Sequence, residues 1–260
     1  MAIITLTTDL GQNDHYLGAV KGSIYSLHPD AKIVDITHNV ESYNISKAAF
    51  VLKNCFYRFP KGSVHILAIN PSLQESSEYL AVHYKEHYFI ATDNGSLSLI
   101  FEQRPEKIIQ LDLKRENNHE SFPLGDIFVK AACHIAKGGT LEFLGKPLEG
   151  MREMIAPTPF TQLNQIRGTV AYIDKYGNAI TNITEGFFNS FGKGRRFTIE
   201  LSGMYQINKI SKYYSEAPEG ENLALFSSSG LLEIAIKEGS AAELMGLRYG
   251  NMIIVEFHDS

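Results

Sequence analysis

Two sequence patterns divide this chain. Up to about residue 145, apolar runs alternate with helix-length amphipathic stretches, which is typical of an α/β layer fold. Beyond residue 161 the runs are short, strand-like and separated by turn signals such as Gly177-Asn178, which favours a small antiparallel barrel or sandwich. Pro157 and Pro159 lie between the two patterns and indicate a linker. We therefore predict an α/β domain over 1–155, a linker over 156–164 and an all-β barrel domain over 165–260.

The first region alternates strand-like and helix-like segments, which predicts a mixed, mainly parallel sheet between helices. Lys85-Glu86 alone separates the apolar runs 78–84 and 87–92. These two runs should therefore form a hairpin and bring some antiparallel pairing into the sheet. We expect the other strands over 3–8, 32–38 and 63–70, and helices over 15–29, 44–59 and 125–138.

Charge and composition limit the kinds of partner. The chain carries 24 Lys and Arg against 29 Asp and Glu, a formal net charge of −5, which argues against a broad nucleic-acid surface. No apolar stretch reaches the roughly 20 residues that span a bilayer, so we expect no membrane partner. Cys55 and Cys133 form neither a CxxC pair nor a disulfide framework, which indicates a reducing compartment and predicts a cytoplasmic protein. The nine histidines show no metal-binding spacing, so we expect no metal site.

Each region has a carboxylate at a position suited to ligand binding. Asp9 directly follows the apolar run 3–8, and open α/β sheets bind ligands at their strand ends. Asp174 and Asn178 flank a turn in the second region, and both offer hydrogen-bonding groups suited to a small molecule. One ligand could touch both regions. Two structural alternatives stay open, in which Asp9 caps the following helix and Asp174 and Asn178 only shape a hairpin turn.

Six sequence blocks, in order along nearly the whole chain, carry a resemblance to a known family. They are TTDLGxxDxYxGxxKG at 7–22, DITH at 35–38, ATDNG at 91–95, GDIF at 125–128, DKYGNAITNI at 174–183 and SSSGLLEIAIKEGSAAELMGL at 227–247. Each block alone is weak, but six in register are specific. The chain resembles the S-adenosylmethionine (SAM) hydroxide adenosyltransferase family, which is similar in fold to the bacterial fluorinase and chlorinase.

The resemblance implies both an assembly and a reaction. It implies an N-terminal α/β domain, a C-terminal β-barrel, a homotrimer, and a site between the N-terminal domain of one subunit and the C-terminal domain of its neighbour. In the family, water or hydroxide attacks the ribose C5′ of SAM and releases adenosine and L-methionine. SAM is then the substrate, and we expect no separate cofactor. Such catalysis depends on orienting and desolvating the attacking group, without a covalent intermediate.

The resemblance also implies roles for individual residues. Asp9 matches the carboxylate that holds the ribose hydroxyls, and Phe122 matches a residue that lines the ribose. The residues that match the surroundings of the methionine and adenine portions are Asp174, Asn178 and Ser228 for methionine, and Tyr214 for adenine.

The positions that hold the attacking water in the family are altered in this chain. The family uses an Asp and an Arg from a DPGVGxxR-type loop and a His from an FHGRD-type loop. Here Asn70, Ser77 and Pro123 stand at the Asp, Arg and His positions. An amide cannot accept the proton, proline has no side-chain donor, and serine carries no charge that would lower the pKa of water. Asn70 and Ser77 remain candidate catalytic positions in this degenerate form, and Glu75 and Asp126 are nearby substitutes, although a solvated loop charge and a helix-start carboxylate are simpler interpretations.

Three functions from different classes fit these residues. The first is a SAM hydrolase in which orientation and the sulfonium leaving group supply much of the rate without a base. The second is a nucleoside-binding protein, a sensor or storage module, that binds SAM or adenosine without turnover. The third is an enzyme that uses another nucleophile such as halide, although the chain shows no clear halide-pocket pattern. We predict the first, with SAM or adenosine as the small-molecule ligand.

Overall fold

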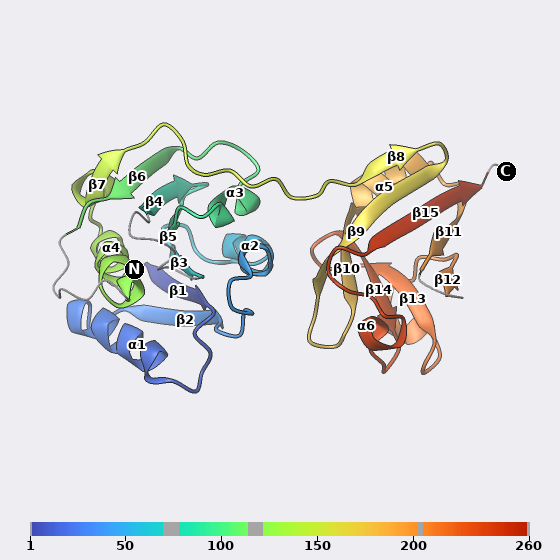
Figure 1. Cartoon of the computed structure of the whole chain (residues 1–260), viewed down its shortest axis with the longest axis horizontal. Helices are drawn as coiled ribbons and strands as arrows, with labels where there is room; N and C mark the ends of the chain where they lie inside the picture. Colours follow the sequence, from blue (N-terminus) through green and yellow to red (C-terminus); the bar gives the residue numbers. More distant parts are fainter. Residues whose placement is uncertain (1, 70–77, 114–121, 202–204, 259–260) are drawn as a thin grey trace. The chain divides into compact units, whose positions relative to one another are not determined.

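The computed structural model describes residues 2–69, 78–113, 122–201 and 205–258. The chain divides into two compact units, residues 1–155 and 156–260 (Figure 1). Each unit has its own hydrophobic core. Among the described residues, no helix is both long and apolar enough to cross a bilayer.

The first unit is built on a seven-stranded sheet. Its strands are β1 Ile3–Thr8, β2 Lys32–Thr37, β3 Val64–Ala68, β4 Tyr79–Tyr84, β5 His87–Thr92, β6 Lys107–Leu111 and β7 Gly145–Pro147. Their order across the sheet is β2-β1-β3-β5-β4-β6-β7. The first four strands in this order pair in parallel, and the other pairings are antiparallel, including the expected β4–β5 hairpin. The predicted α/β domain with a mixed sheet is confirmed.

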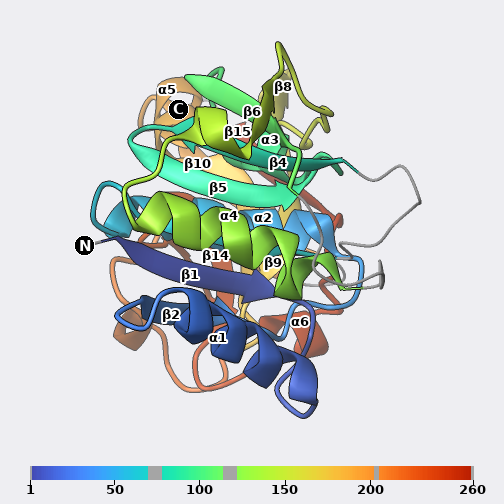
Figure 2. The ribbon, with the colours of Figure 1, turned by 90° about the vertical axis from the view of Figure 1, so that its left-hand side faces the viewer.

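Helices cover both faces of this sheet, as Figure 2 shows. One face carries α1 (His15–Leu27) and α4 (Ile127–Ala136), and the other carries α2 (Ile45–Lys53) and α3 (Ser96–Ile100). Short 3-10 turns complete the unit at η1 Phe56–Arg58, η2 Pro123–Gly125 and η3 Leu141–Leu144.

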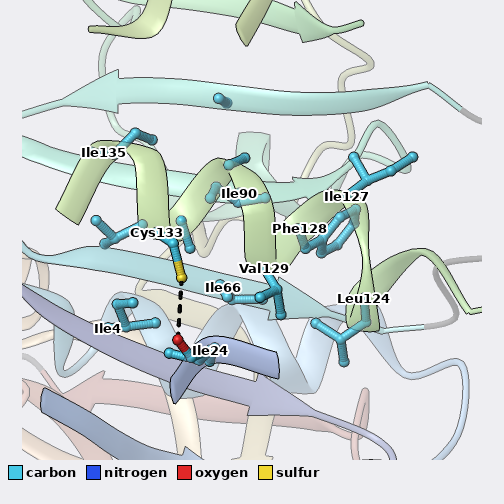
Figure 3. Close-up of a cluster of buried hydrophobic side chains, with 14 of the residues drawn as sticks. Ile4, Ile24, Ile66, Ile90, Leu124, Ile127, Phe128, Val129, Cys133 and Ile135 are labelled. Carbon is cyan, nitrogen blue, oxygen red and sulfur yellow. Dashed lines mark hydrogen bonds between the residues drawn. The ribbon is translucent and has the colours of Figure 1, made fainter. Parts of the chain in front are cut away.

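Two apolar cores result, one on each face of the sheet. Successive side chains of a strand point to opposite faces, so Ile66 joins the core under α4 while Leu67 joins the core under α2. Figure 3 shows the first core, where Phe128 of α4 lies among residues of the sheet. In this core the Cys133 thiol reaches the Ile24 carbonyl oxygen of α1 at 3.8 Å.

The second unit is an antiparallel, nearly closed barrel. Its strands are β8 Phe160–Gln162, β9 Gln165–Ile173, β10 Ala179–Thr184, β11 Arg196–Glu200, β12 Gln206–Ile207, β13 Asn222–Phe226, β14 Leu231–Ile236 and β15 Met252–His258. They follow the order β12-β11-β15-β9-β10-β14-β13, and β8 pairs with β9. A bridge between Ile210 and Ala224 brings the two ends of this order together. The predicted all-β barrel is confirmed as the architecture of this unit.

Two short helices interrupt the barrel, where the sequence pattern predicts only strands and turns. α5 spans Glu185–Gly192 and α6 spans Ala241–Leu244. The Thr184 hydroxyl accepts a hydrogen bond from Phe187 N at 3.1 Å and caps α5. The Phe188 ring of α5 packs against Phe257 in the barrel core. The prediction is wrong for these residues because a capping side chain and a core contact stabilise α5, and the apolar pattern alone shows neither.

Buried polar side chains form a hydrogen-bonded chain across the parallel strands. Thr5 Oγ1 lies 2.8 Å from His65 Nδ1, and His65 Nε2 lies 3.1 Å from His87 Nδ1. The rings of Phe56 and Phe89 pack beside His65. Burial and the neighbouring His87 lower the pKa of His65 to about 3, and burial also lowers the pKa of His87. Both histidines are therefore neutral in the folded protein near neutral pH.

We predict that the protein loses stability as the pH falls below about 6.5, where histidine in the unfolded chain takes up a proton. Folded His65 stays neutral until about pH 3, so acid favours the unfolded state between these two values. The unfolding temperature of a His65→Gln variant should therefore depend less steeply on pH over this range. His15→Gln, at an exposed position at the start of α1, is the control and should keep the wild-type slope. If the unfolding temperature of His65→Gln depended on pH as steeply as that of wild type, His65 would not be the cause of the acid destabilisation.

Candidate functional site

Asp9 lies in the loop between β1 and α1, at the carboxyl end of the parallel strands. Its side chain is half-buried, and Oδ2 accepts a hydrogen bond from the Tyr43 backbone N–H at 3.4 Å. α1 begins at His15, and the residue at its N-cap position is Asp14. The alternative in which Asp9 caps this helix is therefore wrong. Asp9 instead stands at a strand end, where open α/β sheets bind ligands.

His38, directly after β2, fixes the Asp9 loop through its side chain and its backbone. It is 2% exposed, and its Nδ1 atom lies 2.9 Å from Oγ1 of Thr8, the last residue of β1. Its carbonyl oxygen accepts a hydrogen bond from Gly11 N at 2.8 Å. Gly11 has a φ of 71°, a conformation that glycine adopts without strain. The DITH block thus supports the loop that carries Asp9.

Asp35 extends this support to α1. The His38 Nε2 atom lies 3.1 Å from Asp35 Oδ1, and Lys21 Nζ of α1 donates a hydrogen bond to Asp35 Oδ2 at 2.6 Å. Burial alone would raise the pKa of the Asp35 carboxyl, but Lys21 and His38 together lower it. Asp35 is therefore charged near neutral pH, and its hydrogen bond with Lys21 links β2 to α1.

The ATDNG block forms the turn from β5 into α3. Asn94 is buried, its Oδ1 atom accepts a hydrogen bond from Ser96 N at 3.0 Å, and its Nδ2 atom donates to the Ile69 carbonyl at 3.3 Å. Asp93 Oδ1 accepts a hydrogen bond from Arg152 N at 2.8 Å, and burial raises the pKa of Asp93. These side chains stabilise the same end of the sheet as Asp9.

The turn before α4 contains Phe122 and Pro123. The Phe122 ring lies 5.1 Å from the Tyr16 ring of α1, centroid to centroid. Pro123 is buried and begins η2, and its side chain offers no donor or acceptor. Asp126 lies 2.6 Å from Lys130 Nζ one helical turn further, which agrees with the interpretation of Asp126 as a helix-start carboxylate. The candidate positions Asn70, Glu75 and Ser77 lie outside the described residues.

In the second unit, Asp174 closes the turn between β9 and β10 with both carboxylate oxygens. Oδ1 accepts hydrogen bonds from the backbone N–H groups of Tyr176 and Asn178, each at 2.9 Å, and Oδ2 accepts one from Asn178 Nδ2 at 3.1 Å. Gly177 has a φ of 81°, and a Cβ there would clash with Ser240 Oγ. Asp174 and Asn178 thus do shape the hairpin turn, as the structural alternative states. The same hydrogen bonds hold the half-buried Asp174 carboxylate in one orientation.

Glu233 of β14 lies close enough to Asp174 for the two charges to interact, and the sequence motifs do not identify it. Tyr214 Oη, in η4 (Tyr214–Glu216), donates a hydrogen bond to Glu233 Oε1 at 2.5 Å. Burial and the negative charge of Asp174 raise the pKa of Glu233. Burial, Glu233 and Asp174 also raise the pKa of the Tyr214 phenol. The sequence signal for Glu233 was a carboxylate inside the apolar run LLEIAI, a position where charged residues are rare.

The predicted site residues thus form two groups, one in each unit. In the second unit, Asn178 bonds Asp174, Tyr214 bonds Glu233, and the charge of Asp174 acts on Glu233. Asp9 and Phe122 belong to the first unit. Ser228 is exposed in the turn between β13 and β14. Among the described residues, the hydrogen bonds around Asp174 do not include Ser228. Within the same residues, no group of three or more His, Cys, Asp or Glu side chains could hold a metal ion.

Comparison with known families covers both units. Residues 4–145 match the model of the SAM hydroxide adenosyltransferase N-terminal domain, and residues 168–254 match that of its C-terminal domain. The chain belongs to the SAM hydroxide adenosyltransferase family. The resemblance found in the six sequence blocks is thereby confirmed.

Relatives of this chain match along almost its whole length. A protein named (R)-S-adenosyl-L-methionine hydrolase from Methanocaldococcus jannaschii is 28% identical over 95% of this chain and 93% of its own. A Thermus thermophilus protein of the same name is 27% identical over 96% of this chain and 98% of its own. The crystal structure of an uncharacterized conserved protein from Thermotoga maritima aligns with a TM-score of 0.91 and 28% identity, over 97% of this chain and 99% of that one. Proteins named fluorinase also match, at 20% to 24% identity. The homologues thus comprise SAM hydrolases and fluorinases, which supports SAM processing at the level of the family.

We predict that Asp174→Ala destabilises the barrel by about 2–3 kcal/mol, because two backbone N–H groups lose a charged acceptor. Asp174→Asn is the matched control, since its amide oxygen can still accept both backbone hydrogen bonds and only the one from Asn178 Nδ2 is lost, and we expect a loss of about 1 kcal/mol. Urea unfolding followed by circular dichroism measures both. Equal stability of the Ala variant and wild type would show that these hydrogen bonds do not stabilise the turn.

Proposed function

We propose that this protein binds SAM and hydrolyses it to adenosine and L-methionine. The observation that carries the proposal is the match of both family domains along the chain. The names of the Methanocaldococcus and Thermus relatives specify (R)-SAM, so we propose the epimer with R configuration at sulfur as the substrate. We further propose that the reaction takes place in the cytoplasm.

The proposed reaction is a displacement that needs positioning more than proton transfer. The oxygen of water bonds to the ribose C5′ while the bond from C5′ to sulfur breaks. The bonding electron pair stays on sulfur, which becomes the neutral thioether of methionine, and the attacking water loses a proton to solvent. Orientation of the reactants can supply roughly 7 kcal/mol or more of the barrier. Pro123 cannot act as a base, and Asp126 is paired with Lys130, so we assign the rate to orientation and to the sulfonium leaving group.

We propose that the site forms in a homotrimer, between the first unit of one subunit and the barrel of its neighbour. Asp9 accepts two hydrogen bonds from the ribose hydroxyls, a geometry that suits a carboxylate. The exposed ring of Tyr214 packs against the adenine. Asp174 accepts hydrogen bonds from the methionine ammonium group, and Asn178 donates to the methionine carboxylate. Phe122 lines the ribose, and Ser228 supplies a further hydroxyl to the methionine portion.

A second candidate function is adenosyl binding without turnover, as in a sensor or storage module. Pro123 favours it, because this residue stands where the resembled family has a water-holding histidine. The buried proline gives the attacking water no hydrogen bond from its side chain.

Product analysis with each SAM epimer separates the candidates. We expect purified protein to release adenosine and methionine in equal amounts from (R)-SAM. Asp9→Asn should lower kcat/KM about tenfold to hundredfold, because charge-assisted hydrogen bonds to the ribose weaken. Asp14→Asn is the matched control, since Asp14 lies in the same loop, is exposed and makes no side-chain capping bond. Its kcat/KM should equal that of wild type.

Other results of this assay would indicate a different function. Tight binding of SAM without either product would replace hydrolysis by the second candidate. A halogenated nucleoside formed only on addition of halide would indicate an enzyme that uses halide as its nucleophile. Neither binding nor product with either epimer would contradict both candidates.

A further inference from the structure

Glu233 is a buried carboxylate on a strand position that faces away from the barrel core. Its neighbours in β14, Leu232 and Ile234, are part of that core, and successive side chains of a strand point to opposite faces. A carboxylate on the outer face would ordinarily lie in water, yet Glu233 is only 3% exposed. Burial of a carboxylate without an oppositely charged partner is costly. We therefore expect a specific contact that compensates the cost at Glu233.

A small apolar cluster beside Glu233 explains how the carboxylate is covered. Leu225 of β13 is directly opposite Glu233, and Leu223 is opposite Ala235. Leu223, Leu225 and Ala235 form a separate buried cluster, against which Ala217 packs. Ala217 directly follows η4, so the segment that contains Tyr214 lies over this outer face.

The η4 segment is held at two points. The Glu216 carboxylate accepts hydrogen bonds from Lys212 N at 2.8 Å and from Lys209 Nζ at 2.7 Å, which anchors the backbone of the segment. The Tyr214 hydroxyl donates to Glu233 at 2.5 Å, which anchors the far end of the side chain. Tyr214 is nevertheless 44% exposed, so its hydroxyl is fixed while much of the residue remains open to solvent.

We propose that Glu233 is a positioning residue for ligand specificity, which holds the Tyr214 ring in one orientation as a platform for the planar base of the ligand. This inference rests on the proposed function, in which the ligand carries an adenine. A hydrogen bond to an ionised acceptor is about twice as strong as one between neutral groups. When the Tyr214 ring is fixed before binding, the free energy of binding does not include the entropy cost of immobilising this side chain. Glu233 thus raises affinity for the nucleoside portion without touching the ligand.

Calorimetric titration with adenosine and, separately, with L-methionine tests the proposal. Tyr214→Phe and Glu233→Met should each weaken adenosine binding about threefold to tenfold, the range expected when one side chain must be ordered on binding. Methionine binding should stay within about twofold, because the ring does not contact that portion in the proposed site. Glu233→Gln should weaken adenosine binding less than Glu233→Met, because its amide oxygen still accepts the phenol hydrogen bond but without the negative charge. The double variant Tyr214→Phe with Glu233→Met should be no weaker than either single variant, since both remove the same interaction.

A second measurement follows the phenol itself. The chain has no Trp, so absorbance near the tyrosinate band reports tyrosine ionisation without tryptophan overlap. In Glu233→Met, Tyr214 should ionise at lower pH than in wild type, because the hydrogen bond and the negative charge of Glu233 no longer raise its pKa, while burial and Asp174 still do.

The outcomes separate the two proposals. If wild type binds adenosine and Glu233→Met binds it equally well, the inference is wrong while the proposed function stands. Equal losses of adenosine and methionine affinity would show that Glu233 only stabilises the fold, which also overturns the inference. If wild type binds neither SAM nor adenosine, the proposed function fails and the inference fails with it.

Discussion

Helices cover both faces of the parallel strands, and this constraint places the candidate ligand groups of the first unit. Because each face is an apolar core, a polar side chain that is to meet a ligand has to lie at a strand end or in a loop. Asp9 and Asn94 follow β1 and β5 at the same end of the sheet. The hydrogen bond between Thr8 and His38 then fixes the loop beside Asp9. The position of one carboxylate thus depends on the packing of the whole layer.

In the barrel too, hydrogen bonds hold the candidate ligand-binding side chains in position before any ligand is present. Asp174 is held by three hydrogen bonds from its own turn, and Tyr214 is held by Glu233. Preorganised groups of this kind suit a reaction in which the leaving group is already activated, because orientation then supplies much of the rate. In the proposed reaction, a proline at position 123, where the resembled family has a histidine, costs less than it would where a base must remove a proton.

The sequence predicted the layers better than the side-chain contacts, for physical reasons. Apolar periodicity reports which face of a strand is buried, so the mixed sheet and the barrel could be predicted from it. α5 could not, because its stability depends on the Thr184 cap and on contacts between aromatic rings that are distant in sequence. Asp9 could be placed at a strand end because it directly follows an apolar run. Glu233 could not be assigned a partner, because the hydrogen bond from Tyr214 joins residues 19 positions apart, and no local pattern links them.

The most direct test of the account is recovery of activity when two variants, each with one of the two carboxylates replaced by an amide, assemble together. If each site combines Asp9 of one subunit with Asp174 of its neighbour, trimers that contain both Asp9→Asn and Asp174→Asn subunits include sites with both native carboxylates. Random assembly of equal amounts makes about a quarter of the sites native in a symmetric ring. The account predicts that co-expressed subunits release methionine from SAM at about that fraction of the wild-type rate, well above either variant alone. A mixture no more active than the separate variants would show that the two carboxylates do not meet across a subunit boundary, and would contradict the account.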